Sequence, residues 1–318
     1  MFQGMEYIYE VYKERSFSRA ARNLYISQPS LSATVKRIET RVGSPIFDRS
    51  TTPIGLTECG KKYIECVESI LAIQNSFQNY LGDLGGLKTG HLSLGGTHLF
   101  SSYVLPPLIG RFTKAYPQVT VDLIEENSAN LELLLMNGSL DLVVDNSRFN
   151  ETLFSHRLYQ PEHLLLAVPS SFAINQSLQA YRLPGDHIRR GIHLEDGIPS
   201  VPLEAFRDEP FVFLKPENDT RHREMALCRK AGFSPRIILE LDQQVTAYNI
   251  TGSGMGISFI SDTLARHIPP HPHVTYYKLD GPESCREIHF YWKTGKYVSK
   301  AMEIFLETSM PRTPGTAT

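Results

Sequence analysis

The stretch SFSRAARNLYISQPSLSATVKRIE, residues 16 to 39, decides the fold of the N-terminal part of the chain. Apolar residues recur at helical spacing from Phe17 onward, so the first half is predicted to form a short helix. Ser27 is a good N-cap residue, and Pro29 loses no hydrogen bond in a first helical turn. A second helix is therefore predicted to begin near Gln28, after a tight joint, as in a helix-turn-helix.

The second helix is predicted to have one buried and one exposed face. Its buried stripe is formed by Leu31, Val35, Ile38 and Val42. The opposite face carries no acidic residue and presents amide, hydroxyl and cationic side chains. Such side chains contact base edges and phosphates when a helix enters the major groove of DNA. We interpret this helix as a recognition helix, although a helical hairpin with a solvated basic face would share this local pattern.

The next stretch, GSPIFDRSTTPIGLTECG, residues 43–60, is predicted to form a small two-stranded wing with a polar tip. Arg49 on the wing is expected to bind a phosphate, as are Lys36 and Arg37. Gln28 and Ala33 are expected to discriminate bases, because a methyl group complements the C5-methyl of thymine. The predicted DNA-contacting residues are Ser27, Gln28, Pro29, Ser30, Ser32, Ala33, Lys36, Arg37, Arg49 and Thr52.

Composition places the chain among globular proteins with two or three domains. Its 318 residues are 41% hydrophobic and 21% charged, with a formal net charge of −2. Between Arg15 and Arg49, seven basic side chains face only two acidic ones, so the positive charge is local. The four cysteines have no C-x-x-C spacing, which favours reduced thiols over disulfides or a metal site. We find no signal peptide and no apolar run that could span a bilayer, and we expect a cytoplasmic location without membrane contact.

The segments SFSRAARNL, SQPSLS, KRIETRVGSPIFDRS and LTECG, in this order and spacing, resemble the DNA-binding domain of the LysR-type transcriptional regulators. The resemblance covers residues 5–60, and a looser resemblance continues through the rest of the chain. Three positions depart from the family pattern: Arg15 stands in place of a glycine, Ala33 in place of a long polar residue, and Thr34 in place of a glutamine. The base preference of relatives therefore cannot be copied onto this chain.

The resemblance implies an α/β protein with an N-terminal winged helix-turn-helix, a long linker helix and a two-lobed, periplasmic-binding-protein-like effector domain. It implies a homodimer or homotetramer that binds an interrupted palindrome of double-stranded DNA and contacts RNA polymerase. We assign residues 1–58 to the DNA-binding domain and 59–88 to the linker helix. Residues 91–160 and 268–308 are assigned to effector lobe I, and 161–267 to lobe II.

The predicted linker helix follows Thr57, a plausible N-cap. A heptad seam is predicted at Tyr63, Val67, Ile70, Phe77, Leu81 and Leu84. We expect this seam to pair with a second copy of the chain, whereas a long helix packed on its own domain is the alternative. A glycine-rich joint, GDLGGLKTG, residues 82–90, is expected to end the helix.

From His91 onward, short apolar runs alternate with helical stretches, as in an open parallel sheet covered by helices. Two such units are joined by crossovers expected near Gln160 and Ile268. Residues 176–203 contain scattered prolines and glycines, and we interpret them as an inserted surface loop.

Ligands of such sheets bind beyond the carboxyl ends of the strands, where helix N-termini offer free N–H groups. The residues at these strand ends are the predicted effector contacts, although each of them could instead be a helix cap. They are Thr97, His98, Asn127, Ser128, Asn146, Lys215, Asn218, Thr220, Gln243 and Thr246. The family's effector contacts fall on the Thr97 and Thr220 segments. Lys215 and the amides suit a small carboxylate, and a neutral polar metabolite is the alternative.

Other motifs carry little weight. The run TGSGMG, residues 251–256, precedes a predicted strand and lacks nucleotide-binding spacing. His271 and His273 each neighbour a proline and no acid or thiol, so we predict no metal site and no cofactor. The alternative to a regulator is a two-lobed solute-binding protein or small-molecule enzyme. We expect no enzyme, because we find no catalytic constellation. Activation and repression are not distinguished by the sequence.

Overall fold

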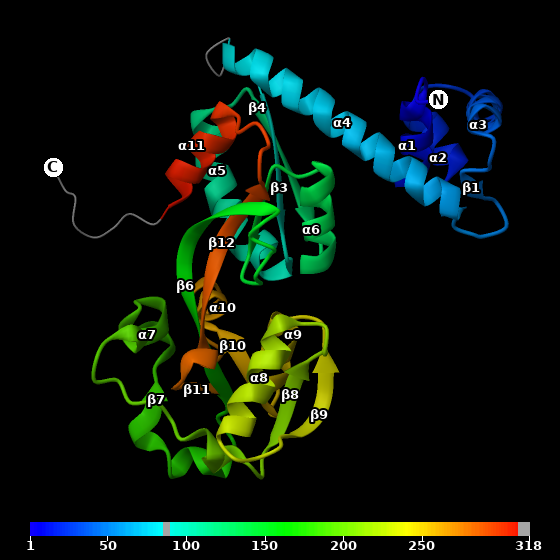
Figure 1. Ribbon diagram of the computed structural model, residues 1–318. Coiled ribbons are helices and arrows are strands. Elements are labelled where there is room, and N and C mark those ends of the chain that lie inside the picture. The colour runs from blue at the N-terminus through cyan, green and yellow to red at the C-terminus, as the bar shows by residue number, and fades with distance from the viewer. Residues whose placement is uncertain (85–89, 311–318) are drawn as a thin grey trace.

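The computed structural model describes residues 1–84 and 90–310, and Figure 1 shows a small N-terminal domain, a long helix and two stacked lobes. The N-terminal domain contains α1 (Met5–Glu14), α2 (Phe17–Asn23), α3 (Gln28–Val42), β1 (Phe47–Asp48) and β2 (Gly55–Leu56). The predicted helix pair and the two-stranded wing are confirmed. Helix α1 was not predicted, and its Ile8 and Val11 lie fully buried beside Leu31 in the core of this domain.

Helix α4 (Glu58–Leu84) is 27 residues long and connects the N-terminal domain to the first lobe (Figure 1). Thr57 caps it as predicted, since its Oγ1 accepts the Gly60 N–H at 2.9 Å. The predicted seam is wrong in its first turns: Tyr63 and Val67 are buried in the core of the same chain, because α4 starts against α1. The side chain of Leu84 and most of the expected glycine-rich joint lie outside the described residues.

The first lobe is built on the parallel strands β3, β4 and β5, in the order β4-β3-β5. Its elements are β3 (Gly90–Gly96), the π-helix η1 (Phe100–Val104), α5 (Leu105–Ala115), β4 (Val119–Glu125), α6 (Ser128–Asn137), β5 (Leu142–Asp145) and α11 (Lys300–Ser309). The apolar faces of α5 and α11 cover one side of the sheet, with Phe112 against Phe305. This arrangement is the predicted βαβαβ unit.

The second lobe is built on the parallel strands β8, β9 and β10. Its strands and α-helices are β7 (Arg182–Leu183), α7 (Gly185–Arg189), β8 (Pro210–Leu214), α8 (Asp219–Lys230), β9 (Arg236–Leu241), α9 (Gln244–Gly252), β10 (Ile257–Ser261), α10 (Asp262–His267) and β11 (Val274–Lys278). Short 3-10 helices are η2 (Ala173–Gln176), η3 (Gln179–Tyr181), η4 (Ile192–Leu194), η5 (Leu203–Phe206) and η6 (Pro282–Ser284).

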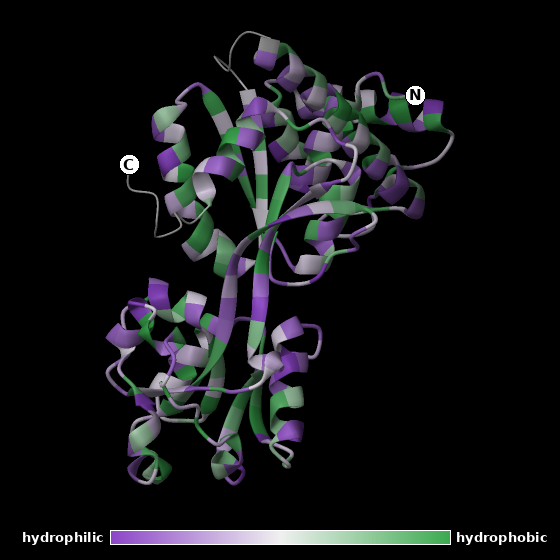
Figure 2. Cartoon of the chain, turned by 60° about the vertical axis from the view of Figure 1, so that its left-hand side comes forward, coloured by the Kyte–Doolittle hydropathy of each residue, from purple (hydrophilic) through white to green (hydrophobic). Residues whose placement is uncertain are grey.

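Two long antiparallel strands, β6 (Phe154–Pro169) and β12 (Cys285–Lys293), run from one lobe into the other. Figure 2 shows both strands in purple where they pass between the lobes, so the connection is polar. The first crossover near Gln160 lies within β6. The second crossover near Ile268 is wrong, because β11 pairs with β6 and β7 in the second lobe and the chain returns only in β12.

Residues 176–203 are not the predicted surface loop. They contain short helices and a strand, and Leu183 and Ile188 are buried in an apolar cluster of the second lobe. His193 is fully buried, with its Nε2 3.0 Å from Oδ2 of Asp262. Pro184, Gly191 and Pro202 lie where short helices of this segment begin, and the segment as a whole is not exposed.

Candidate nucleic-acid interface and interlobe cleft

Helix α3 presents the predicted face to solvent. Its first turn is fixed by Ser27, whose Oγ accepts the N–H of Ser30 at 3.3 Å. The predicted contact residues Ser27, Gln28, Pro29, Ser30, Ala33, Lys36, Arg37, Arg49 and Thr52 are exposed, and Ser32 is half-buried. The structure therefore brings the helix and wing residues onto one domain, with the apolar stripe of α3 facing inward.

Glu39 on α3 holds the wing in place, a role that the sequence reasoning missed. Its Oε1 accepts the N–H groups of Ile46 and Phe47 at 2.9 and 3.2 Å. Its Oε2 lies 3.2 Å from Nη2 of Arg49, and the Arg49 guanidinium also lies over the ring of Phe17. Arg49 is thus positioned beside α3 and remains half-exposed, so it retains donors for a phosphate.

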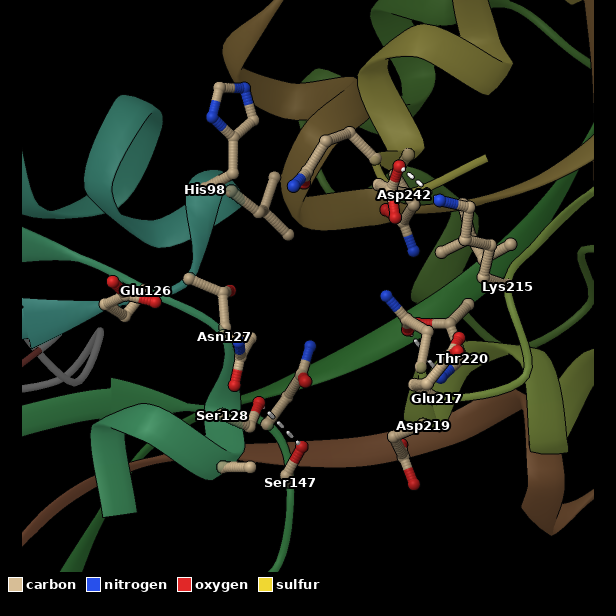
Figure 3. A pocket seen from close by; sticks show the side chains of 18 of the residues that line it. His98, Glu126, Asn127, Ser128, Ser147, Lys215, Glu217, Asp219, Thr220 and Asp242 are labelled. Atoms are coloured by element: carbon tan, nitrogen blue, oxygen red, sulfur yellow. Dashed lines mark hydrogen bonds and ion pairs between the residues drawn. The ribbon is translucent and has the colours of Figure 1, made fainter. Parts of the chain in front are cut away.

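A cavity of about 1180 Å³ separates the two lobes, and Figure 3 shows side chains of both lobes facing across it. It is lined by nine predicted effector contacts: Thr97, His98, Asn127, Ser128, Asn146, Lys215, Asn218, Thr220 and Gln243. The tenth, Thr246, is exposed on α9 and does not line the cavity; this part of the prediction is wrong. Helix α9 begins at Gln244, and only its first turn reaches the cleft.

The capping alternative explains part of this pattern. The Asn127 Oδ1 accepts the N–H of Asn130 at 2.9 Å, at the start of α6. The Asn218 Oδ1 accepts the N–H of Thr220 at 3.0 Å, at the start of α8. These side chains therefore serve the helices, and they also line the cavity.

Arg286 forms the floor of the cleft and was not predicted. Its side chain is 3% exposed, and its Nε donates to Oε2 of Glu162 at 2.6 Å. Its Nη1 donates to Oγ1 of Thr220 at 3.0 Å and lies 3.3 Å from Oδ2 of Asp219. Burial disfavours the charged guanidinium, but the Glu162 carboxylate outweighs this and raises the pKa of Arg286.

Glu162 ties the floor to the first lobe, because the Asn146 Nδ2 donates to the same Oε2 at 2.8 Å. The sequence does contain a hint of this pair: Glu162 and Arg286 each lie in a stretch with many apolar residues, PEHLLLAVP and CREIHFYW. A charged side chain buried in such a stretch needs a partner. Their pairing joins β6 to β12, 124 positions apart.

A second buried carboxylate uses the hydroxyl of Ser128. Asp145 is fully buried, its Oδ2 accepts the Ser128 Oγ at 2.8 Å, and its Oδ1 accepts the N–H of Ser147 at 2.7 Å. Burial raises the pKa of Asp145, and these hydrogen bonds oppose that rise. The hydroxyls of Ser128 and Thr220 are thus engaged within the protein, which the sequence did not indicate.

At the rim, Lys215 forms an ion pair with Asp242, at 2.8 Å. The hydrogen bond with Asp242 raises the pKa of Lys215, so the ammonium stays charged. The cation expected to meet a carboxylate effector therefore already has a carboxylate partner.

Comparisons with known proteins agree with this architecture. Residues 2–61 match the family model described as a bacterial regulatory helix-turn-helix protein of the lysR family. Residues 85–312 match the model of the LysR substrate binding domain. The chain belongs to the LysR family. It is a DNA-binding transcriptional regulator with an effector-binding domain.

Curated relatives cover nearly the whole chain. The uncharacterized HTH-type transcriptional regulator YcgK of Bacillus subtilis is 29% identical over 306 residues, covering 96% of this chain and 92% of that protein. The HTH-type transcriptional regulator XapR of Escherichia coli is 28% identical over 267 residues, covering 82% of each. The LysR family regulator CbnR has the same fold: its crystal structure gives a TM-score of 0.68 at 19% identity, covering 97% of this chain and 98% of that one.

Within residues 1–84 and 90–310, no helix is long and apolar enough to cross a membrane. Across the same residues, no group of three or more His, Cys, Asp or Glu side chains could hold a metal ion.

Proposed function

We propose that this LysR family regulator binds duplex DNA as a homo-oligomer and changes its DNA affinity when a small molecule enters the interlobe cleft. The observation that carries the proposal is the presence of both surfaces in one chain: the acid-free face of α3 and the cavity lined by both lobes. The protein of one neighbouring structure, full-length CbnR, was solved with its target DNA, with a TM-score of 0.67. That likeness supports the DNA part of the proposal.

For the DNA contacts, we propose that Gln28 and Ala33 discriminate bases while Lys36, Arg37 and Arg49 fix the register on phosphates. The exposure of these side chains supports the division. Promoter DNA of a bacterium lies in the cytoplasm, and we place the chain there. The contact with RNA polymerase stays a prediction.

Dimerisation is proposed to use an apolar stripe on the second half of α4. This stripe comprises Ile73, Phe77, Tyr80 and Leu81, which are 71%, 61%, 44% and 50% exposed. Apolar residues at heptad-like spacing on a long helix are typical of a helix that pairs with another helix. Pairing two chains would hold two copies of α3 at a fixed separation, which suits an interrupted palindrome. Two such dimers would form a homotetramer.

Helix α6 is proposed to carry the effector signal toward the DNA-binding domain. Its N-terminal Asn127 and Ser128 line the cleft. At its other end, the Asn137 Nδ2 donates to Oε2 of Glu68 on α4 at 2.9 Å. Gly138 approaches α4 so closely that a Cβ added there would lie 2.8 Å from the Cβ of Ala72. A shift of α6 would therefore move α4.

The alternative function, that of a solute-binding protein or an enzyme, accounts for fewer of these features. Neither needs a recognition helix with a wing. The Thr220 hydroxyl accepts a hydrogen bond from the Arg286 cation, and the Ser128 hydroxyl donates to Asp145, a fully buried carboxylate that also holds the Ser147 N–H, so neither pair is arranged as a nucleophile and a base that face a substrate. We therefore propose no catalytic role for the cleft.

The proposal is tested by two measurements on the full chain. A metabolite screen by thermal shift identifies compounds that bind the folded state, because such binding raises its apparent stability. Each compound found is then added to a DNA titration. A change in the dissociation constant for promoter DNA supports the proposal, and an unchanged constant for every bound compound contradicts it.

A further inference from the structure

The charges around the interlobe cleft are not those of an anion site. The cavity is lined by the cations Arg148, Lys215, Arg223 and Arg286 and by the carboxylates Glu125, Glu126, Glu217, Asp219 and Asp242. Glu162, which contacts Arg286 directly, adds a sixth carboxylate. Four cations against six carboxylates give a negative region when the histidines are neutral. Such a region repels an anionic ligand on approach.

Two of the other cations that line the cavity are already paired. Lys215 contacts Asp242 at 2.8 Å, and Arg223 contacts Asp219 at 2.9 Å. An anionic effector would have to displace one of these carboxylates or bind the exposed Arg148 at the rim. Displacement leaves a like charge close to the ligand, which costs free energy.

The floor nevertheless offers a hydrogen-bond donor. The Arg286 side chain is 3% exposed, and its Nε and Nη1 are engaged with Glu162, Thr220 and Asp219. Among the described residues, its Nη2 has no hydrogen-bond acceptor, and the side chain lines the cavity. Nη2 is not one of the buried atoms that lack a partner, so solvent in the cavity reaches it, and its N–H groups are free to donate to an acceptor oxygen of a ligand.

We propose that the effector is an uncharged molecule that places a carbonyl or hydroxyl oxygen on Nη2 of Arg286. The inference rests on the proposed function and replaces the expectation of a carboxylate. The Arg286 charge is balanced by Glu162 and Asp219, so a neutral acceptor completes the hydrogen bonding without adding charge. Thr97 and Asn127 of the first lobe lie across the same cavity and supply further polar contacts.

The test is a thermal-shift screen at pH 7 with two libraries of matched carbon skeletons. One library holds uncharged compounds, such as succinamide, nicotinamide and glucose. The other holds the anionic counterparts, here succinate, nicotinate and glucose 6-phosphate. Compounds that stabilise the full chain are then titrated by calorimetry at low and high salt.

We expect the strongest stabilisation from the uncharged library, with affinities that change less than twofold between the two salt concentrations. Arg286→Lys keeps a cation beside Glu162 but loses the second terminal amine, and it should weaken the uncharged compound at least tenfold. Arg148→Met is the matched control, because an uncharged ligand on the floor does not need the exposed guanidinium. Arg148→Met should therefore bind the uncharged compound with the same affinity as the wild type.

Tighter binding of the anionic library, lost in Arg148→Met or at high salt, would overturn the inference and leave the proposed function intact. Equal affinity of Arg286→Lys and wild type for the uncharged compound would also overturn it. Failure of every compound in both libraries to bind would count against the effector-binding function itself, and against the inference with it.

Discussion

The Asn137 side chain donates a hydrogen bond of 2.9 Å from Nδ2 to Oε2 of Glu68, which ties the end of α6 to linker helix α4. Burial raises the pKa of Glu68, and the neighbouring Glu65 carboxylate adds to this rise. The contact lies at a cavity of about 900 Å³ that is also lined by Tyr12 of the DNA-binding domain. The pair therefore lies where the DNA-binding domain, the linker helix and the first lobe meet.

Asn137→Ala should uncouple the cleft from the DNA. By reciprocity, DNA binding in the wild type should change amide hydrogen exchange in the first turn of α6, and the variant should lose that change. The expected loss of coupling is about 0.5–2 kcal/mol. Asn249→Ala on the exposed side of α9 is the control and should behave as the wild type. An unchanged exchange pattern of α6 when DNA binds the wild type would show that no such coupling exists.

Gln28→Ala and Arg49→Ala should weaken DNA binding in different ways. Loss of a base contact should relax the preference at particular operator positions by about 1–3 kcal/mol each. Loss of a phosphate contact should weaken all sequences alike and make the salt slope shallower. Binding of both variants to a library of single-base operator changes, at two salt concentrations, separates these outcomes. A uniform loss in Gln28→Ala would mean that this side chain touches the backbone.

Thr97→Val and Thr220→Val should both reduce the effector response, for different reasons. Thr97 lines the cavity, so its loss should affect ligand affinity alone. Thr220 accepts a hydrogen bond from Arg286, so its loss should also lower the free energy of unfolding by about 1 kcal/mol. Denaturant unfolding and ligand titration measure the two effects. Normal effector responses in both variants would make these hydroxyls structural only.

Asp262→Asn should loosen residues 176–203, because Asp262 contacts the buried His193 and accepts the N–H of His163 at 2.9 Å. Burial disfavours the Asp262 carboxylate, but hydrogen bonds from His163 and His193 outweigh it and hold its pKa below the usual range. A depressed pKa stabilises the fold above the unfolded value of about 3.9, and this contribution is lost as pH falls.

Denaturant unfolding from pH 7 to pH 3 tests this. Near neutral pH the free energy of unfolding of the wild type should exceed that of Asp262→Asn by about 1–3 kcal/mol, and this difference should shrink below about pH 4. The exposed Asp196→Asn in the same segment is the control. A difference that stays constant across this range would contradict the role given to the Asp262 charge.

Phe77→Asp should convert the dimer into a monomer, because it places a charge within the stripe on α4. Sedimentation at working concentration measures the change. Leu153→Asp, at a leucine of similar partial exposure on the first lobe, should remain dimeric. If Phe77→Asp remains a dimer, the apolar stripe on α4 is not the surface through which two chains pair.

Local signals predicted much of the fold. The residues next to Ser27 and Thr57 in the sequence are enough to predict that both cap helices. The two-stranded wing can likewise be predicted from residues that lie close together in the sequence. The second crossover was misplaced because the apolar pattern of β11 fits a buried strand in either lobe. Strand partners are decided by packing between distant segments, which a local pattern does not contain.

The candidate site was predicted less completely for the same reason. Nine of the ten residues predicted as effector contacts line the cleft because strand ends gather at one edge of a parallel sheet. Arg286 and Glu162 were missed because their meeting depends on the pairing of β6 with β12. Thr246 was included wrongly, since proximity to Gln243 in sequence does not determine which side of α9 faces the cleft.

A binding titration of the full chain against duplex DNA from its own promoter region, across a salt series, tests the central claim most directly. We predict binding by a dimer or larger oligomer, with an association constant that falls steeply as salt rises, because Lys36, Arg37 and Arg49 of each copy displace counterions. The compound that most stabilises the chain should shift this constant. Binding by a monomer, or an association constant indifferent to salt, would contradict the account.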